Sequence, residues 1–267
     1  IQKDGTYSVI PRMWGGETTA DELRRIADAV DKYKIPTVKV TGGQRIDLLG
    51  VKKEDLPGVW RDLDMPSGHA YAKALRTVKT CVGSEWCRFG TQDSTGLGIK
   101  LERFLCGSWT PAKVKLGVSG CPRNCAEATV KDIGIICVES GYDIHVAGAA
   151  GLHVRGTDLL GHVKTEEEAI EYVAAFMQLY REKAAYLERI WKWLEKYGLD
   201  RARAQAWMRG PSSTSTNARI NSTGTMRVNT FSGRCSSSHA PRPAPSNEAG
   251  ICQRSRFHCP RSSRRYP

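Results

Sequence analysis

Four cysteines that occur as two close pairs are the strongest candidates for chemistry in this 267-residue chain. Five residues separate Cys81 from Cys87, and three separate Cys121 from Cys125. Two thiolate pairs supplied by separate loops suit a cubane iron–sulfur cluster, because each iron takes one soft sulfur ligand and the loops must enclose a compact object. The spacing therefore favours a cluster as the use of these four residues.

Two other uses of the four cysteines compete with a cluster. A structural zinc site normally uses pairs separated by two or four residues, so spacings of five and three disfavour zinc. Four unrelated core cysteines stay an open alternative, since free cysteine is often a small buried residue. We predict that Cys106 and Cys137, in apolar surroundings, are packing residues. No role is assigned to Cys235, Cys252 and Cys259.

The second cysteine pair follows a predicted strand. Val114, Leu116 and Val118 alternate along the chain and lead directly into Cys121. This period of two predicts a strand that delivers a cysteine at its end. A second alternating stretch over residues 133–146 predicts a hairpin, and the two together indicate a small sheet.

The first 51 residues have the pattern of a β-α-β-β unit. Thr19 and Glu22 form a capping box, and apolar residues at helical spacing predict a helix near residues 19–33. Val38 and Val40 alternate with polar residues, and alternation resumes after a glycine turn. Residues 52–68 are interpreted as a polar, proline-bearing link.

Strong helical periodicity returns over residues 165–197. Thr165 and Glu168 form a second capping box, and Gly198 follows as a stop signal. The pattern predicts one or two long helices, whose aromatic residues are interpreted as core packing.

Residues 206–267 differ in composition from the rest of the chain. They lack apolar periodicity and are predicted to be disordered. Ten arginines against one acid give this tail +9 of the total charge of +12, so residues 1–205 carry only +3. The abrupt change at Ala206 fits either a genuine basic tail or translation of a GC-rich gene in a wrong reading frame. Nucleic-acid binding would rest on this tail alone, so no nucleic-acid partner is predicted.

Further features of the sequence concern the cellular location of the protein and a region upstream of residue 1. No run of about 18 apolar residues and no secretory leader are present, so no membrane partner is predicted and a cytoplasmic location is expected. The chain begins at Ile1, within a predicted strand, which favours a fragment whose upstream part is missing. It has no Gly-x-Gly-x-x-Gly fingerprint, so FAD and NAD(P)H are expected only on that upstream region.

Two long segments resemble the signature sequences of the sirohaem-dependent nitrite and sulfite reductases. They are residues 80–94, TCVGSEWCRFGTQDS, and residues 118–128, VSGCPRNCAEA. Within that family they are most similar to the large subunits of the NAD(P)H-dependent assimilatory nitrite reductases. Upstream, the stretch from PRMWGG at residues 11–16 to GGQRID at residues 42–47 resembles the ferredoxin-like half-domain that precedes the signature.

The resemblance implies an α+β fold. A ferredoxin-like half-domain is expected over residues 1–64 and an α/β domain that binds sirohaem and [4Fe–4S] over residues 65–205. The disordered basic tail of residues 206–267 lies outside the resemblance.

The same resemblance implies the cofactor ligands. Cys81, Cys87, Cys121 and Cys125 would ligate the [4Fe–4S] cluster, and the Cys125 thiolate would also bridge to the sirohaem iron. Six-electron reduction of nitrite to ammonium needs an electron reservoir that touches the reactive iron, and this bridge supplies one. Electrons would come from a donor domain or subunit.

Basic residues should line both the substrate and the cofactor, because nitrite is an anion and sirohaem carries several carboxylates. By family position, the expected catalytic groups are Arg12, Arg76 and Lys79. The expected cofactor contacts are Gln44 and Arg45 on sirohaem, and Arg123, which would offset cluster charge.

Two other functions compete with nitrite reduction. An assimilatory sulfite reductase haemoprotein would use the same four cysteines and much of the same cation set, and relative turnover of nitrite and sulfite separates the two. A non-catalytic iron–sulfur electron carrier predicts cluster absorbance without macrocycle bands.

Overall fold

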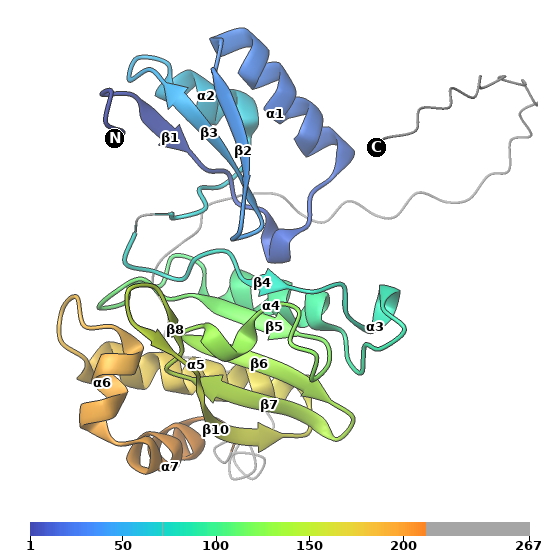
Figure 1. Cartoon of the computed structure of the whole chain (residues 1–267), viewed down its shortest axis with the longest axis vertical. Coiled ribbons are helices and arrows are strands. Elements are labelled where there is room, and N and C mark those ends of the chain that lie inside the picture. Colours follow the sequence, from blue (N-terminus) through green and yellow to red (C-terminus); the bar gives the residue numbers. More distant parts are fainter. Residues whose placement is uncertain (71, 212–267) are drawn as a thin grey trace, which may run out of the picture. The chain divides into compact units, whose positions relative to one another are not determined.

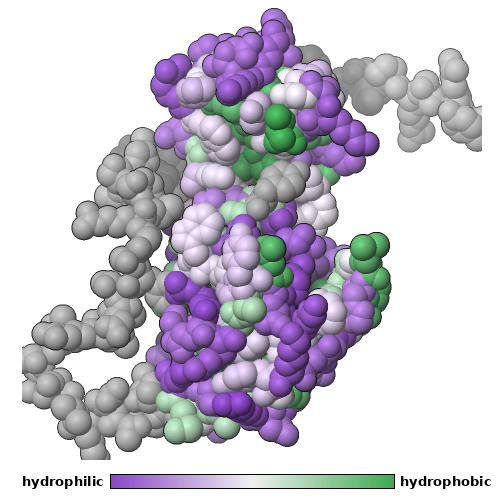
Figure 2. All heavy atoms as spheres, turned by 90° about the vertical axis from the view of Figure 1, so that its left-hand side faces the viewer, coloured by the Kyte–Doolittle hydropathy of each residue, from purple (hydrophilic) through white to green (hydrophobic). Residues whose placement is uncertain are grey.

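The computed structural model of the chain describes residues 1–70 and 72–211. These residues form a small three-stranded sheet with its own helices and a five-stranded sheet with several helices (Figure 1). Within the described ranges, none of the helices combines the length and apolar character that a bilayer crossing requires. The face of the molecule seen in Figure 2 is predominantly hydrophilic.

The N-terminal unit has the β-α-β-β order that the sequence predicts. Its elements are β1 (Tyr7–Val9), the 3-10 turn η1 (Trp14–Gly16), α1 (Ala20–Tyr33), β2 (Thr37–Thr41), β3 (Arg45–Val51) and α2 (Leu56–Leu63). The strands are antiparallel in the order β1-β3-β2. The predicted capping box begins α1, and Lys34 ends it in the left-handed conformation.

Residues 52–68 are not simply the link that the sequence suggested, because they contain α2. Pro57 occupies the first turn of that helix, where a missing N–H costs nothing. Val59 and Leu63 turn into a core that also contains Leu48 and Ile26. Tertiary burial of one helix face therefore overrides the polar composition of the segment.

The second unit is built around a mixed five-stranded sheet in the order β10-β7-β6-β5-β4. Its strands are β4 (Lys79–Thr80), β5 (Leu116–Ser119), β6 (Ile133–Val138), β7 (Gly141–Val146) and β10 (Asp158–Val163). β4, β5 and β6 run parallel, whereas β6, β7 and β10 are antiparallel neighbours. The predicted strand before Cys121 and the predicted hairpin are both confirmed.

The helices and minor elements of the second unit surround this sheet. They are α3 (Gly83–Trp86), α4 (Ser94–Leu105), η2 (Ala128–Val130), β8 (Ala149–Ala150), β9 (Val154–Arg155), α5 (Glu166–Lys183), α6 (Ile190–Tyr197) and α7 (Leu199–Arg209). Leu101 of α4, Val118 of β5 and Phe176 of α5 are all fully buried in one core. α5 and α6 confirm the predicted helices over residues 165–197.

The folded chain continues past the expected start of the tail at residue 206. α7 runs to Arg209, Ala206 is fully buried, and the Gly210 N–H donates to the Ala206 carbonyl at 3.0 Å. The start predicted for the tail is thus too early by several residues. The rest of the predicted disordered tail, from residue 212, lies outside the described residues.

Candidate metal centre

Two parallel strands bring the two cysteine loops to one edge of the sheet. Thr80 on β4 lies beside Val118 on β5, and Cys81 follows Thr80 directly. The Cys81 N–H donates to the Val118 carbonyl at 3.4 Å, and Cys121 comes two residues after β5 ends. Because the carboxyl ends of parallel strands meet at the same edge, Cys81 and Cys121 start from neighbouring backbone positions.

Hydrogen bonds join the first cysteine loop to the residue before Cys121. The Gly120 carbonyl accepts from the Thr91 N–H at 2.7 Å and from the Thr91 hydroxyl at 2.9 Å. The Gly120 N–H lies 3.1 Å from the Cys81 Sγ, and the Ser94 hydroxyl lies 3.3 Å from the same sulfur. The Ser94 hydroxyl also donates to the Cys81 carbonyl at 2.9 Å, and backbone donors such as the Gly120 N–H tune a metal-bound sulfur.

The two loops touch backbone against backbone, which explains their glycines. Gly83 has φ +63°, and a Cβ at Gly120 would lie 2.8 Å from the Gly83 Cα. A Cβ at Gly90 would come within 2.5 Å of the Gly83 carbonyl carbon. A side chain at Gly120 would therefore push the two cysteine loops apart, and one at Gly90 would distort the first loop itself.

The four signature thiols differ in exposure. Cys121 is buried, Cys81 and Cys87 are half-buried, and Cys125 is exposed. The six cysteines within the described residues are all free thiols. Among the described residues, no group of three or more His, Cys, Asp or Glu side chains is positioned to hold a metal ion as it stands. Four thiols on two adjoining loops nevertheless have the chemistry of a cluster site.

The two cysteines predicted to pack are both buried. Cys106 caps the end of α4, and Cys137 lies in β6 within the main core. Burial, with smaller contributions from Cys81 and Cys121, raises the pKa of Cys137 to about 12. Cys137 therefore stays a neutral thiol. The other three cysteines of the chain, Cys235, Cys252 and Cys259, lie outside the described residues.

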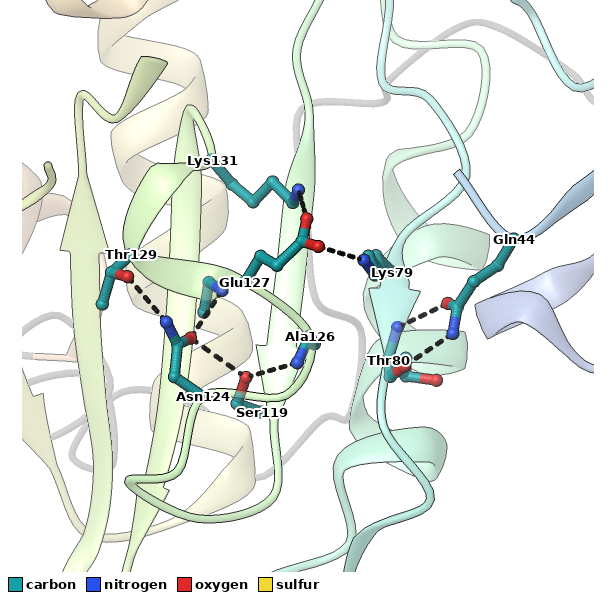
Figure 3. Close-up of polar contacts among 10 residues, drawn as sticks. Gln44, Lys79, Thr80, Ser119, Asn124, Ala126, Glu127, Thr129 and Lys131 are labelled. Atoms are coloured by element: carbon teal, nitrogen blue, oxygen red, sulfur yellow. Dashed lines mark hydrogen bonds and ion pairs between the residues drawn. The ribbon is translucent and has the colours of Figure 1, made fainter. Parts of the chain in front are cut away.

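Lys79, at the start of β4, forms an ion pair with the carboxylate of Glu127 (Figure 3). Its Nζ is 3.0 Å from Glu127 Oε1, and the Lys131 Nζ is 2.9 Å from Glu127 Oε2. Hydrogen bonds from Lys131 and Lys79 lower the pKa of Glu127 to about 2. Glu127 is therefore ionised at neutral pH and is shared by two ammonium groups.

The loop from Cys121 to Cys125 is fixed by Asn124, which the sequence reasoning missed. Asn124 Oδ1 accepts from the Ala128 N–H at 2.7 Å, and Nδ2 donates to the Thr129 hydroxyl at 2.6 Å (Figure 3). The Ser119 hydroxyl lies 3.3 Å from Asn124 Oδ1. Asn124 also has φ +58°, a conformation that asparagine tolerates better than most residues. The sequence could have indicated this role, because an asparagine directly before Cys125 is a residue type that often fixes a turn.

Gln44, expected to contact sirohaem, binds the backbone beside Cys81. Its Nε2 donates to the Thr80 carbonyl at 2.8 Å, and the Thr80 N–H donates to its Oε1 at 2.9 Å (Figure 3). The side chain thus acts as an extra strand partner for β4. In this structure both ends of its amide are engaged by protein.

Arg12, expected on the substrate side, instead lies in the protein interior. Its guanidinium forms an ion pair with Glu102 of α4, and both side chains are 0% exposed. It also donates to the Ser67 carbonyl at 3.0 Å and lies 3.2 Å from His69 Nδ1. Burial and the Arg12 charge lower the pKa of His69, so a neutral imidazole can accept this hydrogen bond. The ion pair neutralises the buried Glu102 carboxylate, which needs a cation, and the expected catalytic role of Arg12 stays a prediction.

The three remaining predicted arginines lie in different surroundings. Arg45 is buried and donates to the Gly68 carbonyl at 3.4 Å. Arg76 is half-buried, and its charge contributes to lowering the pKa of Lys113. The Arg123 guanidinium carbon lies 3.9 Å from the ring centre of Phe89, so Arg123 joins the two cysteine loops by a cation–π contact.

A second group of cations, which the sequence reasoning also missed, surrounds a pocket of about 260 Å³. Lys113, Lys115 and Arg189 line it, and Arg189 pairs with buried Asp132 at 2.7 Å. Burial, together with neighbouring cations, lowers the pKa of both lysines. The sequence could have indicated this group, because Lys113 and Lys115 are two residues apart before β5 and so point to the same side of the chain.

Comparison with protein families assigns almost the whole described chain. The nitrite and sulphite reductase 4Fe-4S domain matches residues 71–210, and the nitrite/sulfite reductase ferredoxin-like half domain matches residues 1–66. The resemblance seen in the cysteine segments is therefore confirmed.

Curated relatives include both nitrite and sulfite reductases. The chain is 64% identical to a nitrite reductase [NAD(P)H] of Bacillus subtilis over 199 residues, which cover 74% of this chain and 25% of the relative. It is 48% identical to the nitrite reductase (NADH) large subunit of Escherichia coli, covering 76% and 25%. It is 37% identical to an assimilatory-type sulfite reductase of Nitratidesulfovibrio vulgaris, covering 76% and 94%. The chain thus spans about a quarter of the length of these two nitrite reductases.

Solved structures share the fold. The NirA protein of Mycobacterium tuberculosis superposes with a TM-score of 0.68 at 18% identity, over 77% of this chain and 40% of that one. Dissimilatory sulfite reductase I superposes with a TM-score of 0.67 at 15% identity, over 74% and 68%. At these identities the likeness concerns the fold alone.

Proposed function

The chain belongs to the nitrite and sulphite reductase family, and on that premise we propose that it is the catalytic part of an NAD(P)H-dependent nitrite reductase. The reaction would be the six-electron reduction of nitrite to ammonium. The observation that carries the proposal is the pair of cysteine loops at the carboxyl edge of β4 and β5, joined to each other through Gly120.

Cys81, Cys87, Cys121 and Cys125 would hold a [4Fe–4S] cluster. The exposure of Cys125 supports the further proposal that this residue would also contact the sirohaem, because an exposed side chain is accessible to a second group. When bound, the two centres supply the electron transfer and the cleavage of nitrogen–oxygen bonds. Gly120 supports this ligand set by donating its N–H to the Cys81 sulfur.

We propose that Lys79 attracts nitrite and supplies protons. It comes two residues before Cys81, its side chain is 17% exposed, and Glu127 directs its ammonium group. A cation positioned beforehand at a reacting anion lowers the barrier without reorganising during the reaction. Arg76, near Lys113, is a weaker candidate for the same task.

Electrons would enter from a donor domain or subunit outside this chain. The nitrite reductases it resembles are about four times as long as the matched segment, which leaves room there for FAD and NAD(P)H sites. A cytoplasmic location stays a prediction that fits this chemistry.

An assimilatory sulfite reductase is the second candidate. A specific comparison favours it, because the chain covers 94% of such an enzyme from Nitratidesulfovibrio vulgaris at 37% identity. The identity of 64% to a nitrite reductase favours nitrite as the substrate.

The test is a visible spectrum and a turnover assay of protein expressed with sirohaem synthesis available. We expect macrocycle bands over a broad iron–sulfur background, and ammonium formed from nitrite with a reduced artificial donor. Cluster absorbance without macrocycle bands would instead identify a non-catalytic iron–sulfur carrier. Faster turnover of sulfite than of nitrite would establish the second candidate.

A further inference from the structure

Glu127 adopts a backbone conformation that its residue type does not favour. Its φ is +56°, in the left-handed region where a side chain crowds the following carbonyl group. Glycine or asparagine would adopt it at lower cost, and Asn124, three residues earlier, is such a residue. A glutamate in this conformation indicates that its side chain has a task that offsets the strain.

That side chain joins Lys79 of β4 to Lys131, which ends η2. Lys79 Nζ lies 3.0 Å from one carboxylate oxygen and Lys131 Nζ lies 2.9 Å from the other (Figure 3). The two lysine side chains are only 17% and 12% exposed, whereas Glu127 itself is 57% exposed. Without the carboxylate, the two partly buried ammonium groups would repel each other and move apart.

The ion pair also spans the two cysteine loops. Lys79 precedes Cys81 by two residues, and Glu127 follows Cys125 by two residues. The contact therefore connects β4, at the start of one loop, with the turn that ends the other. Lys131 pairs with Glu127 on the same turn and fixes the carboxylate from its other side.

We propose that Glu127 is a positioning residue that holds the Lys79 ammonium group, through their ion pair, in the orientation in which it acts on nitrite. The inference rests on the proposed function for the role of Lys79. The Lys79–Glu127 contact can be tested without it. Glu127 touches no reacting atom in this scheme and acts through Lys79.

The first experiment measures how well Glu127 protects Lys79, using the full chain without cofactors. Reductive methylation followed by mass spectrometry should label Lys79 at least about threefold faster in Glu127→Gln and in Glu127→Gly than in the wild type. Lys100, paired with Glu166, serves as the internal control and should label at an unchanged rate. Equal labelling of Lys79 in all three proteins would overturn the proposal.

The second experiment measures steady-state kinetics of the cofactor-loaded enzyme with nitrite. We expect Glu127→Gln to lower kcat about tenfold, as for loss of one hydrogen bond between charged groups. KM for nitrite should rise as well, because a Lys79 ammonium group that Glu127 no longer holds attracts the anion less effectively. Glu127→Gly should show the same loss, although it relieves the left-handed strain.

Iron content and kinetics together separate the possible failures. A wild type that does not reduce nitrite would refute the proposed function, and the labelling result would then test only the Lys79–Glu127 contact. An active wild type with unchanged kcat in both variants would refute the positioning role. Loss of iron from both variants would also refute it, because Glu127 would then serve cluster assembly. Glu182→Gln, which breaks the ion pair between Glu182 of α5 and Arg209 of α7, is the matched control and should have the same kcat and iron content as the wild type.

Discussion

Arg12 and Glu102 form an ion pair in which both side chains are 0% exposed, joining the N-terminal unit to α4. Glu102 also accepts hydrogen bonds from the Gly15 N–H at 2.9 Å and from the Val78 N–H at 3.0 Å. Burial raises the pKa of Glu102, and the Arg12 charge and these donors offset part of the rise. The pair connects three segments that the sequence separates widely.

Breaking this pair should strongly destabilise the fold. Glu102→Ala would leave the Arg12 guanidinium buried without its carboxylate, which costs about 3–5 kcal/mol. Denaturant unfolding of the cofactor-free chain measures the loss. The double variant Arg12→Met/Glu102→Leu removes both charges and should lose much less. Equal losses in the two proteins would contradict the account of the ion pair.

Asn124 should be required to fix the turn between Cys121 and Cys125. Asn124→Ala removes its hydrogen bonds to Ala128 and Thr129 and places a less tolerant residue at φ +58°. We expect a loss of about 1–3 kcal/mol in thermal unfolding. Asn124→Gly retains the conformational freedom and should lose less. A larger loss in the glycine variant would show that backbone strain is not part of the effect.

The partly buried ammonium group of Lys115 should lower the free energy of unfolding at neutral pH. Burial first, and then the charges of Lys113 and Lys131, lower its pKa. At a pH between the lowered pKa of the folded state and the ordinary pKa of 10.5, Lys115 is protonated more often in the unfolded chain than in the folded chain. The contribution of Lys115 to the free energy of unfolding therefore rises with pH in this range. Lys115→Met should therefore stabilise the cofactor-free chain at pH 7, by about 0.5–2 kcal/mol. The gain should shrink as the pH rises towards 10.5.

Lys100 provides the control of opposite sign for that measurement. The hydrogen bond to Glu166 raises the pKa of Lys100 in the folded chain. Lys100 therefore adds to the free energy of unfolding below pH 10.5, and this stabilisation is lost as the pH rises through the pKa of the folded state. Lys100→Met should bring no gain at pH 7. A gain of the same size in both variants would show that the apolar side chain, not the lost charge, is responsible.

The signature cysteines should differ from the packing cysteines in iron binding. Cys121→Ser, at the buried end of the second loop, should reduce iron and acid-labile sulfide to background after anaerobic purification, because a serine oxygen is a harder ligand than a thiolate. Cys106→Ser changes a buried residue at the end of α4 and should retain both. Iron retained in the Cys121 variant would exclude this residue as a ligand.

Much of the fold could be predicted because its signals are local. The capping boxes at Thr19 and Thr165 determine where α1 and α5 begin, and apolar alternation marks β5 and the β6–β7 hairpin. These patterns involve residues a few positions apart, so no knowledge of tertiary contacts is needed. The segment of α2 escaped prediction because its helical state depends on burying Val59 and Leu63 against distant strands.

The cysteine spacing by itself determined which loops could carry metal chemistry, and the signature segments around it indicated the family. Tertiary structure alone decided which partners the charged residues meet. The partner of Arg12 lies 90 residues away, and Lys79 meets Glu127 across the sheet edge. A charge can be read from one position, but whether it faces a ligand or a buried counter-charge depends on which distant segments the fold brings beside it.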